Sequence, residues 1–178
     1  MINKLLLSSL LILTLSEAKD SFSSERLLGI EVGYAGLKTK DAIGLDESSN
    51  SVEFGFRIGA QNQDWRTTLI GNMSSSDGHK IQKAMISFDK FVWQSLYKKD
   101  NIMFKPYLSG HLGYIKHTAD GITNEGISEK GMLYGGGAGL VWNVLNEVDF
   151  DLGYRYSFTE LDNLDSLSTV TLGVNYIY

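Results

Sequence analysis

The chain is dominated by segments in which large apolar residues alternate with small or charged ones. In the clearest segment, residues 148–158, Val, Phe, Leu and Tyr occupy the even positions, whereas Asp, Gly, Arg and Ser occupy the odd ones. A period of two residues is typical of a strand with one apolar and one polar face. Seven more segments alternate in the same way: 28–34, 52–58, 65–70, 83–89, 102–115, 132–142 and 169–178. The sequence therefore predicts an all-β chain of eight antiparallel strands.

The lengths of these segments and of their connections suggest how the strands are arranged. The segments average about nine residues, close to the length that a tilted strand needs to cross a bilayer, whereas soluble strands usually have about five or six. Longer polar connections, at 38–50, 74–80, 117–130 and 159–165, alternate with short ones at 60–64, 96–101 and 143–146. This alternation predicts an up-and-down transmembrane β-barrel. A soluble antiparallel barrel or meander, which requires no such asymmetry, is the alternative.

The two faces of the segments differ in size, and this difference decides which face is inside. An eight-stranded barrel has a narrow lumen, so the face rich in Gly and charged residues should point inward and the bulky face toward lipid. A soluble barrel would reverse this arrangement. The run 91–93 breaks the alternation and would fit a β-bulge.

The predicted inward face carries five acids and five bases. A buried charge needs a partner, because desolvating one alone costs several kcal/mol. We therefore predict a salt-bridge network that plugs the lumen, in which Glu31 lies opposite Arg57 if the first loop is symmetric about residue 44. Its members are Glu31, Glu53, Arg57, Arg66, Lys83, Asp89, Lys105, Asp149, Asp151 and Arg155.

Several aromatic residues lie near the predicted strand ends. Tyr and Trp are enriched where a membrane meets water, so these residues would form interfacial girdles. The ordinary preference of aromatic residues for strands is the alternative. The residues are Tyr34, Trp65, Trp93, Trp142, Tyr156, Tyr176 and Tyr178.

The first 18 residues have the layout of a secretory signal peptide. Lys4 precedes a largely apolar run at 5–15, and Ser16-Glu17-Ala18 forms a small-x-small cleavage pattern. A short buried helix is the alternative. We expect cleavage after Ala18, which leaves residues 19–178 as one barrel domain. No later segment approaches the roughly 18 consecutive apolar residues of a membrane helix.

The last strand carries a more specific resemblance. Its alternating residues Val170, Leu172, Val174, Tyr176 and Tyr178 end on an aromatic residue. They resemble the C-terminal signal that the outer-membrane assembly machinery recognises. The whole mature chain resembles the small eight-stranded barrels of Gram-negative outer membranes typified by the OmpA membrane domain, OmpX and Opa-type proteins. No residues follow the last strand, so we expect no OmpA-type periplasmic domain.

This resemblance implies export through the periplasm and residence in the cell outer membrane, in contact with membrane lipid and lipopolysaccharide. It favours a structural or surface-interaction role for a monomer. A narrow porin-like channel for ions or small molecules and a lipid A-modifying hydrolase are the alternatives.

Few residues suggest catalysis or metal binding. The chain has no Cys, which excludes disulfides and thiolate metal sites, and only three His. Ser109 and His111 share the inward face, but at about 7 Å apart they are too distant for a nucleophile and its base. We therefore predict no catalytic residue, no metal and no cofactor. A net charge of −5 argues weakly against a nucleic-acid partner.

Overall fold

The computed structural model describes residues 24–40, 46–76, 79–93, 97–99, 102–119, 127–145, 147–162 and 164–178. The predicted signal peptide, residues 1–18, lies outside this set. No helix long and apolar enough to cross a membrane is present among these residues. The strands are β1 (Glu25–Lys40), β2 (Asp46–Gln61), β3 (Trp65–Ser76), β4 (His79–Phe91), β5 (Tyr97–Lys99), β6 (Ile102–Ala119), β7 (Ile127–Leu145), β8 (Val148–Thr159) and β9 (Leu164–Ile177).

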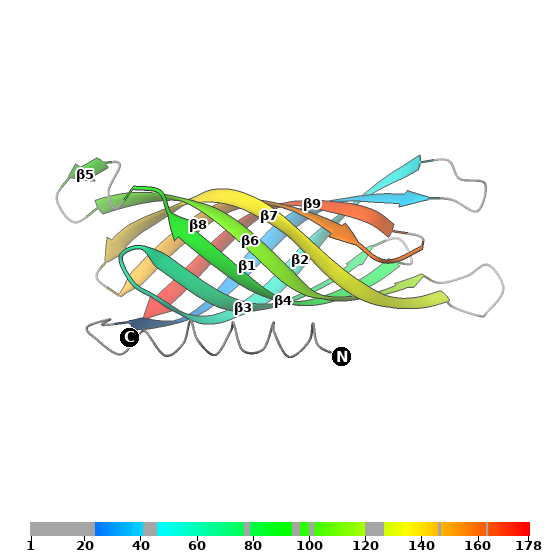
Figure 1. The fold of residues 1–178 in the computed structure, drawn as a ribbon, viewed down its shortest axis with the longest axis horizontal. Coiled ribbons are helices and arrows are strands. Elements are labelled where there is room, and N and C mark those ends of the chain that lie inside the picture. Colours follow the sequence, from blue (N-terminus) through cyan, green and yellow to red (C-terminus); the bar gives the residue numbers. More distant parts are fainter. Residues whose placement is uncertain are drawn as a thin grey trace, which may run out of the picture.

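The eight long strands form a closed antiparallel barrel (Figure 1). Neighbours in sequence pair with one another, β4 pairs with β6, and the first and last strands close the ring. At the terminal edge, the backbone groups of Arg26 and Tyr178 exchange two hydrogen bonds of 3.0 and 2.9 Å. The three-residue β5 pairs with β6 beyond the point where β4 ends. The predicted eight-stranded up-and-down barrel is confirmed.

The strands are longer than the sequence pattern indicates, from 12 residues in β3 and β8 to 19 in β7. Most of the predicted loop 38–50 is paired strand, with Lys40 opposite Asp46, and much of 117–130 is also strand. The predicted extents of these long loops are therefore wrong. Alternation in hydropathy marks only the part of a strand between lipid and lumen, whereas backbone pairing continues through Ser, Thr and Asn once the register is set.

The predicted bulge at 91–93 is wrong as well. β4 keeps its register with β6 up to Phe91 and then ends, and both Val92 and Trp93 are exposed. The alternation breaks there because the strand stops. Register shifts occur instead at Lys38/Thr39 between β1 and β9, and at Asn143/Leu145 between β7 and β8.

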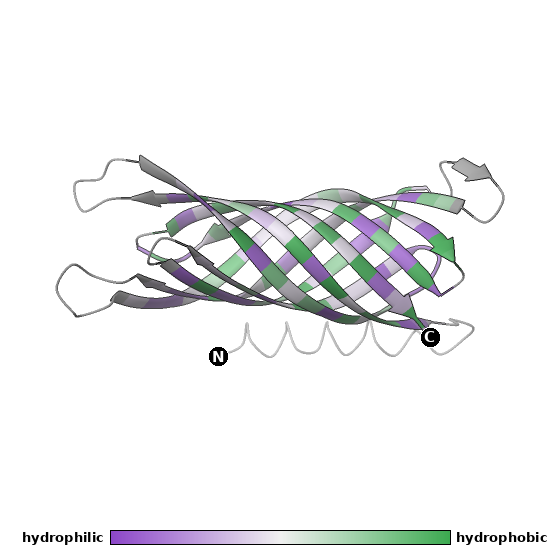
Figure 2. Ribbon diagram, turned by 180° about the vertical axis from the view of Figure 1, so that it is seen from behind, coloured by the Kyte–Doolittle hydropathy of each residue, from purple (hydrophilic) through white to green (hydrophobic). Residues whose placement is uncertain are grey.

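The barrel is apolar outside and polar inside, as the sequence predicts. Hydrophilic and hydrophobic residues alternate along each strand (Figure 2). Outward residues such as Phe56 and Leu108 are 68% and 59% exposed, whereas Glu31 and Arg66 on the inward face are 4% and 1% exposed. On β7 the outward apolar face runs from Met132 to Trp142. Ten residues cover about 33 Å along a strand, or roughly the 25 Å height of an apolar band when tilted.

The lumen also holds bulky apolar side chains, which we did not predict. Near the long connections lies a loop-end apolar cluster of nine buried residues: Leu37, Ile70, Ile81, Met85, Ile115, Leu133, Leu161, Leu164 and Leu167. Near the short turns lies a turn-end apolar cluster of Phe91, Tyr107 and Val141. The lumen therefore holds apolar clusters toward both ends, and apolar and charged residues are interleaved along it, since Ile70 is opposite Arg57.

Candidate functional site

Asp151 of β8 is a junction of the charged network and is 1% exposed. Its carboxylate is 3.2 Å from Nη2 of Arg57 and 2.6 Å from Nη2 of Arg66. The Arg66 approach is an ion contact rather than a well-aligned hydrogen bond. The Tyr107 hydroxyl donates a third contact of 2.8 Å. One carboxylate therefore joins side chains from β2, β3 and β6.

Arg66 extends this group toward the short turns. Its Nε donates to Asp89 at 2.7 Å, and the Ser87 hydroxyl donates to the same carboxylate at 2.8 Å. The guanidinium carbon lies 4.9 Å from the centre of the Tyr107 ring and 5.8 Å from that of Phe91. Arg66 thus joins the charged network to the turn-end apolar cluster, and cation–π contact supplements its ion pairs.

Glu31 is a second junction, on β1. It accepts from Asn72 at 2.7 Å, pairs with Arg155, and lies 3.4 Å from Nε of Arg57. The residue directly opposite Glu31 is Gly55, so the predicted register is wrong by two residues. The first connection is symmetric about residue 43, and the Glu31–Arg57 contact forms diagonally between the strands.

The remaining members of the predicted network occupy different environments. Lys83 pairs with Glu53 at 2.6 Å. Asp149 accepts hydrogen bonds from Gln61 and Asn143 at 3.2 and 2.7 Å. Lys105 is half-buried, with its ammonium 5.6 Å from the centre of the Phe91 ring, and it forms none of the ion pairs found among the described residues. The other nine are at least nine-tenths buried.

Glycines on the facing strands provide the space for these long side chains. A Cβ atom at Gly139 would lie 2.4 Å from the Tyr107 hydroxyl, and one at Gly173 would lie 2.4 Å from Nη1 of Arg57. Because real Cβ atoms do not approach other atoms so closely, a larger residue at either position would force the end of the Tyr107 or Arg57 side chain to move. The glycine-rich inward face and the charged network are therefore parts of one packing arrangement.

The predicted girdle residues lie on the outer face, at both ends of the barrel. Trp65, Trp93, Trp142, Tyr176 and Tyr178 are near the short turns, and Tyr34 and Tyr156 are nearer the long connections. Five of the seven are exposed, whereas Trp142 and Tyr156 are half-buried. Trp142 stacks on Phe150 at 5.6 Å between ring centres.

The residues of the predicted assembly signal all lie on the outward face of the last strand. Val170, Leu172, Val174 and Tyr176 belong to β9, and Tyr178 follows it. They are 37 to 60% exposed. Their side chains are therefore accessible on one lipid-facing wall. Their role in assembly stays a prediction.

The structure adds polar residues that the sequence analysis did not single out. Asn72, Gln61 and Tyr107 each hydrogen-bond to a buried carboxylate. Each lies on the inward side by its position in the alternation, which was the available signal. The predicted network contained only charged residues and therefore included none of the three.

The His111 environment also differs from the one considered above. Nε2 of His111 is 2.8 Å from the hydroxyl of Ser157 on β8, across Gly135 on the intervening strand. Ser109 is not its partner. The pair is buried, and Nδ1 of His111 has no hydrogen-bond partner among the described residues, so no third group orients the ring. His117 lies opposite Glu129, and the part of the chain described here has no cluster of three or more His, Cys, Asp or Glu suited to a metal ion.

Replacing Tyr107 with Phe should reduce the free energy of unfolding by about 1.5–3 kcal/mol, because Asp151 loses a hydrogen bond to a charged group. Urea titration of the refolded protein in phospholipid vesicles, followed by Trp fluorescence, measures this change. Tyr134→Phe, at an exposed outward position, is the matched control and should change stability by less than about 0.5 kcal/mol. Equal effects of the two variants would contradict the assigned role of Tyr107.

The comparisons with known proteins agree with this geometry. A family model described as the outer membrane protein beta-barrel domain matches residues 5–177. No curated protein sequence matches the chain.

Solved structures with the same fold include Neisserial surface protein A, with 16% identity, a TM-score of 0.60, and coverage of 85% of this chain and 97% of that one. Outer membrane protein H of Pseudomonas aeruginosa has 24% identity and a TM-score of 0.58, covering 86% and 99%. Ail, the attachment invasion locus protein of Yersinia pestis, has 18% identity and a TM-score of 0.50, again covering 86% and 99%. At these identities the likeness shows the fold alone, whereas the family match spans nearly the whole chain. The chain belongs to the outer membrane protein β-barrel family.

Proposed function

We propose that this outer-membrane barrel has a structural or surface-interaction role and that its lumen is plugged. The observation that carries this proposal is the filled lumen, in which paired charges are packed together with residues of the loop-end and turn-end apolar clusters. A continuous water path would have to displace these buried side chains. We further propose that residues 1–18 are removed on export, that the assembly machinery inserts the chain, and that it acts as a monomer.

The pairing of the charges favours a plug over a narrow channel. A conducting pore needs polar groups that water or a permeating ion can contact. Here Asp151 and Glu31 each contact three side chains from other strands, and both are almost fully buried. Separating such a group from its partners would leave uncompensated buried charges, which costs several kcal/mol. The network therefore opposes opening.

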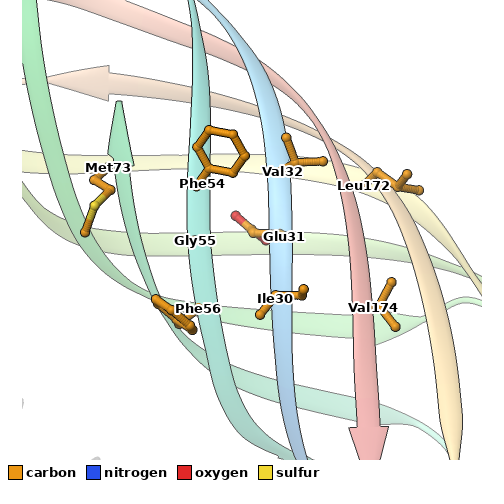
Figure 3. A pocket seen from close by; sticks show the side chains of 9 residues that line it. All are labelled: Ile30, Glu31, Val32, Phe54, Gly55, Phe56, Met73, Leu172 and Val174. Carbon is orange, nitrogen blue, oxygen red and sulfur yellow. The ribbon is translucent and has the colours of Figure 1, made fainter. Parts of the chain in front are cut away.

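The outer wall supports direct contact with acyl chains. A shallow hollow of about 370 Å³ crosses β1, β2, β3 and β9, and its walls are almost entirely apolar side chains. Figure 3 shows Phe54 and Phe56 of β2 beside Ile30 and Val32 of β1, with Leu172 on the neighbouring strand. A surface of this kind is stable in hydrocarbon, whereas in water it would promote aggregation.

The long connections are the candidate surface for external partners. The strands that lead to them continue as polar ladders, such as 46–51 in β2, beyond the apolar band. The similar barrel Ail of Yersinia pestis is named the attachment invasion locus protein. The polar continuation of the strands is consistent with a surface-interaction role for this chain.

Planar-bilayer recording tests the plug. The folded protein should produce no steady single-channel steps at protein-to-lipid ratios at which a known porin conducts readily. Heat-modifiable gel migration of the same sample confirms that the inserted protein is folded. Reproducible steps from the folded wild-type protein would contradict the plug and favour the narrow-channel alternative.

A further inference from the structure

Three lysines gather on the outer wall near the long connections. Lys80 lies on β4, Lys116 on β6 and Lys130 on β7, three adjacent strands of the barrel. In the strand register, Lys116 is directly opposite Lys130 and also opposite Gln82, and Lys80 is opposite Thr118. The alternation of exposure places all three on the outward face.

No internal carboxylate offsets these charges among the described residues, because none of the ion pairs found there includes them. Glu129 is next to Lys130 in sequence, but it points to the lumen side, opposite His117. Like charges directly opposite on neighbouring strands destabilise a sheet. The Lys116–Lys130 pair therefore suits a site at which an external anion supplies the missing charge.

Lys116 and Lys130 border an open hollow of about 290 Å³ whose walls also include Gln82, Ala84 and Tyr114. Lys83 also contributes to the wall, but its ammonium is held by Glu53 inside the barrel. The small Ala84 and the flat Tyr114 leave room in front of the basic groups. The hollow is thus lined by basic groups on the side of the long connections and by Ala84 and Tyr114 on the side of the short turns.

The height of this patch relative to the membrane selects the kind of anion. Lys116 and Lys130 each lie two residues nearer the long connections than the last outward apolar residues of their strands, Tyr114 and Met132. Two residues span about 7 Å of strand, so the ammonium groups lie just beyond the hydrocarbon edge, at the depth of lipid headgroups. On the opposite wall, Lys38 of β1 has only Ser48 and Ser166 as its register neighbours. Three lysines on adjacent strands therefore gather on one side of the barrel, whereas Lys38 has no lysine opposite it on either neighbouring strand.

We propose that Lys80, Lys116 and Lys130 bind the phosphate groups of an anionic lipid of the outer leaflet, of the phosphorylated lipid A type. The acyl chains would lie along the apolar outer wall between Tyr114 and the short turns, and the phosphates would neutralise the charges of the facing lysines. This inference rests on the proposed placement of the barrel, with its long connections outward.

The test measures binding of bisphosphorylated lipid A to the purified, folded barrel in neutral nanodiscs, with lipid A lacking phosphates as the second probe. The wild-type protein should prefer the phosphorylated form. Lys116→Gln should weaken that binding by about tenfold, and the triple variant Lys80→Gln/Lys116→Gln/Lys130→Gln by more, because charge-assisted contacts to phosphate are lost. Lys38→Gln removes the same charge at the same end of the barrel and should leave affinity within about twofold. Raising the salt concentration should weaken the phosphate-dependent part.

Two results would overturn the site. Equal loss in Lys116→Gln and Lys38→Gln would show a diffuse charge effect, and equal binding of the two lipids would show recognition of acyl chains only. Gel migration of each variant confirms that it is folded. If the protein does not conduct and does not prefer phosphorylated lipid A, only the lysine site is refuted. If the protein conducts and prefers phosphorylated lipid A, only the plug is refuted.

Discussion

Replacing Asp151 with Asn should lower the free energy of unfolding by about 3–5 kcal/mol, the usual effect of removing one partner from a buried ion pair. Asp151 contacts Arg57, Arg66 and Tyr107 at distances between 2.6 and 3.2 Å. Asn has nearly the same size, so packing is preserved and the change isolates the charge. Arg66 would retain Asp89, but Arg57 and Arg66 would share one fewer carboxylate in an environment closed to water.

The measurement is urea unfolding in phospholipid vesicles, followed by the fluorescence of Trp65, Trp93 and Trp142. Asp162→Asn, at an exposed position between β8 and β9, makes the same chemical change and should alter stability by less than about 0.5 kcal/mol. If Asp151→Asn were as mild as Asp162→Asn, water would reach the centre of the lumen, and the proposed plug would lose its main support.

The strand pattern predicted the side of most members of the charged network: nine of the ten residues predicted to point inward are buried, whereas Lys105 is half-buried. In a strand, the side of a residue follows from its parity, and the parity of Asp149, Asp151 and Arg155 is clear because bulky residues separate them without interruption. The same rule would have placed Ile70, Ile115 and Leu133 inside. The loop-end apolar cluster was not predicted because the inward face was described by its most frequent residue types, which are small or charged. A few large apolar residues on the same face were therefore overlooked.

The partners of the inward charges could not be predicted from the sequence. Arg57 and Asp151 are 94 residues apart, and whether they meet depends on how the strands are staggered around the closed ring. A shift of two residues in one hairpin preserves every face and changes every opposite pair, as the Glu31–Gly55 register shows. The length of a connection determines the stagger of the two strands it joins only when the residues at which both strands end are known. Here the strands continue into polar segments that carry no alternation signal.

Leu172→Arg should destabilise the protein in a bilayer by about 2–4 kcal/mol, because it places a charge on the lipid-facing wall near mid-height. Leu172 of β9 pairs with Val32 and Leu152, which are also outward, and it is 45% exposed. In a soluble barrel, a residue so exposed would tolerate arginine with an effect within about 0.5 kcal/mol. The size of the effect therefore distinguishes a lipid-facing surface from a water-facing one.

Two companion variants separate charge from depth. Leu172→Ala shortens the same side chain without a charge, and Ser168→Arg places the charge on the same face four residues nearer the long connections, where it should cost about 0–1 kcal/mol. Unfolding in vesicles should rank Leu172→Arg as the most damaging of the three. If Ser168→Arg and Leu172→Arg were equally mild, the apolar wall would face water. The inside-out arrangement, which both the plug and the lysine patch require, would then be untenable.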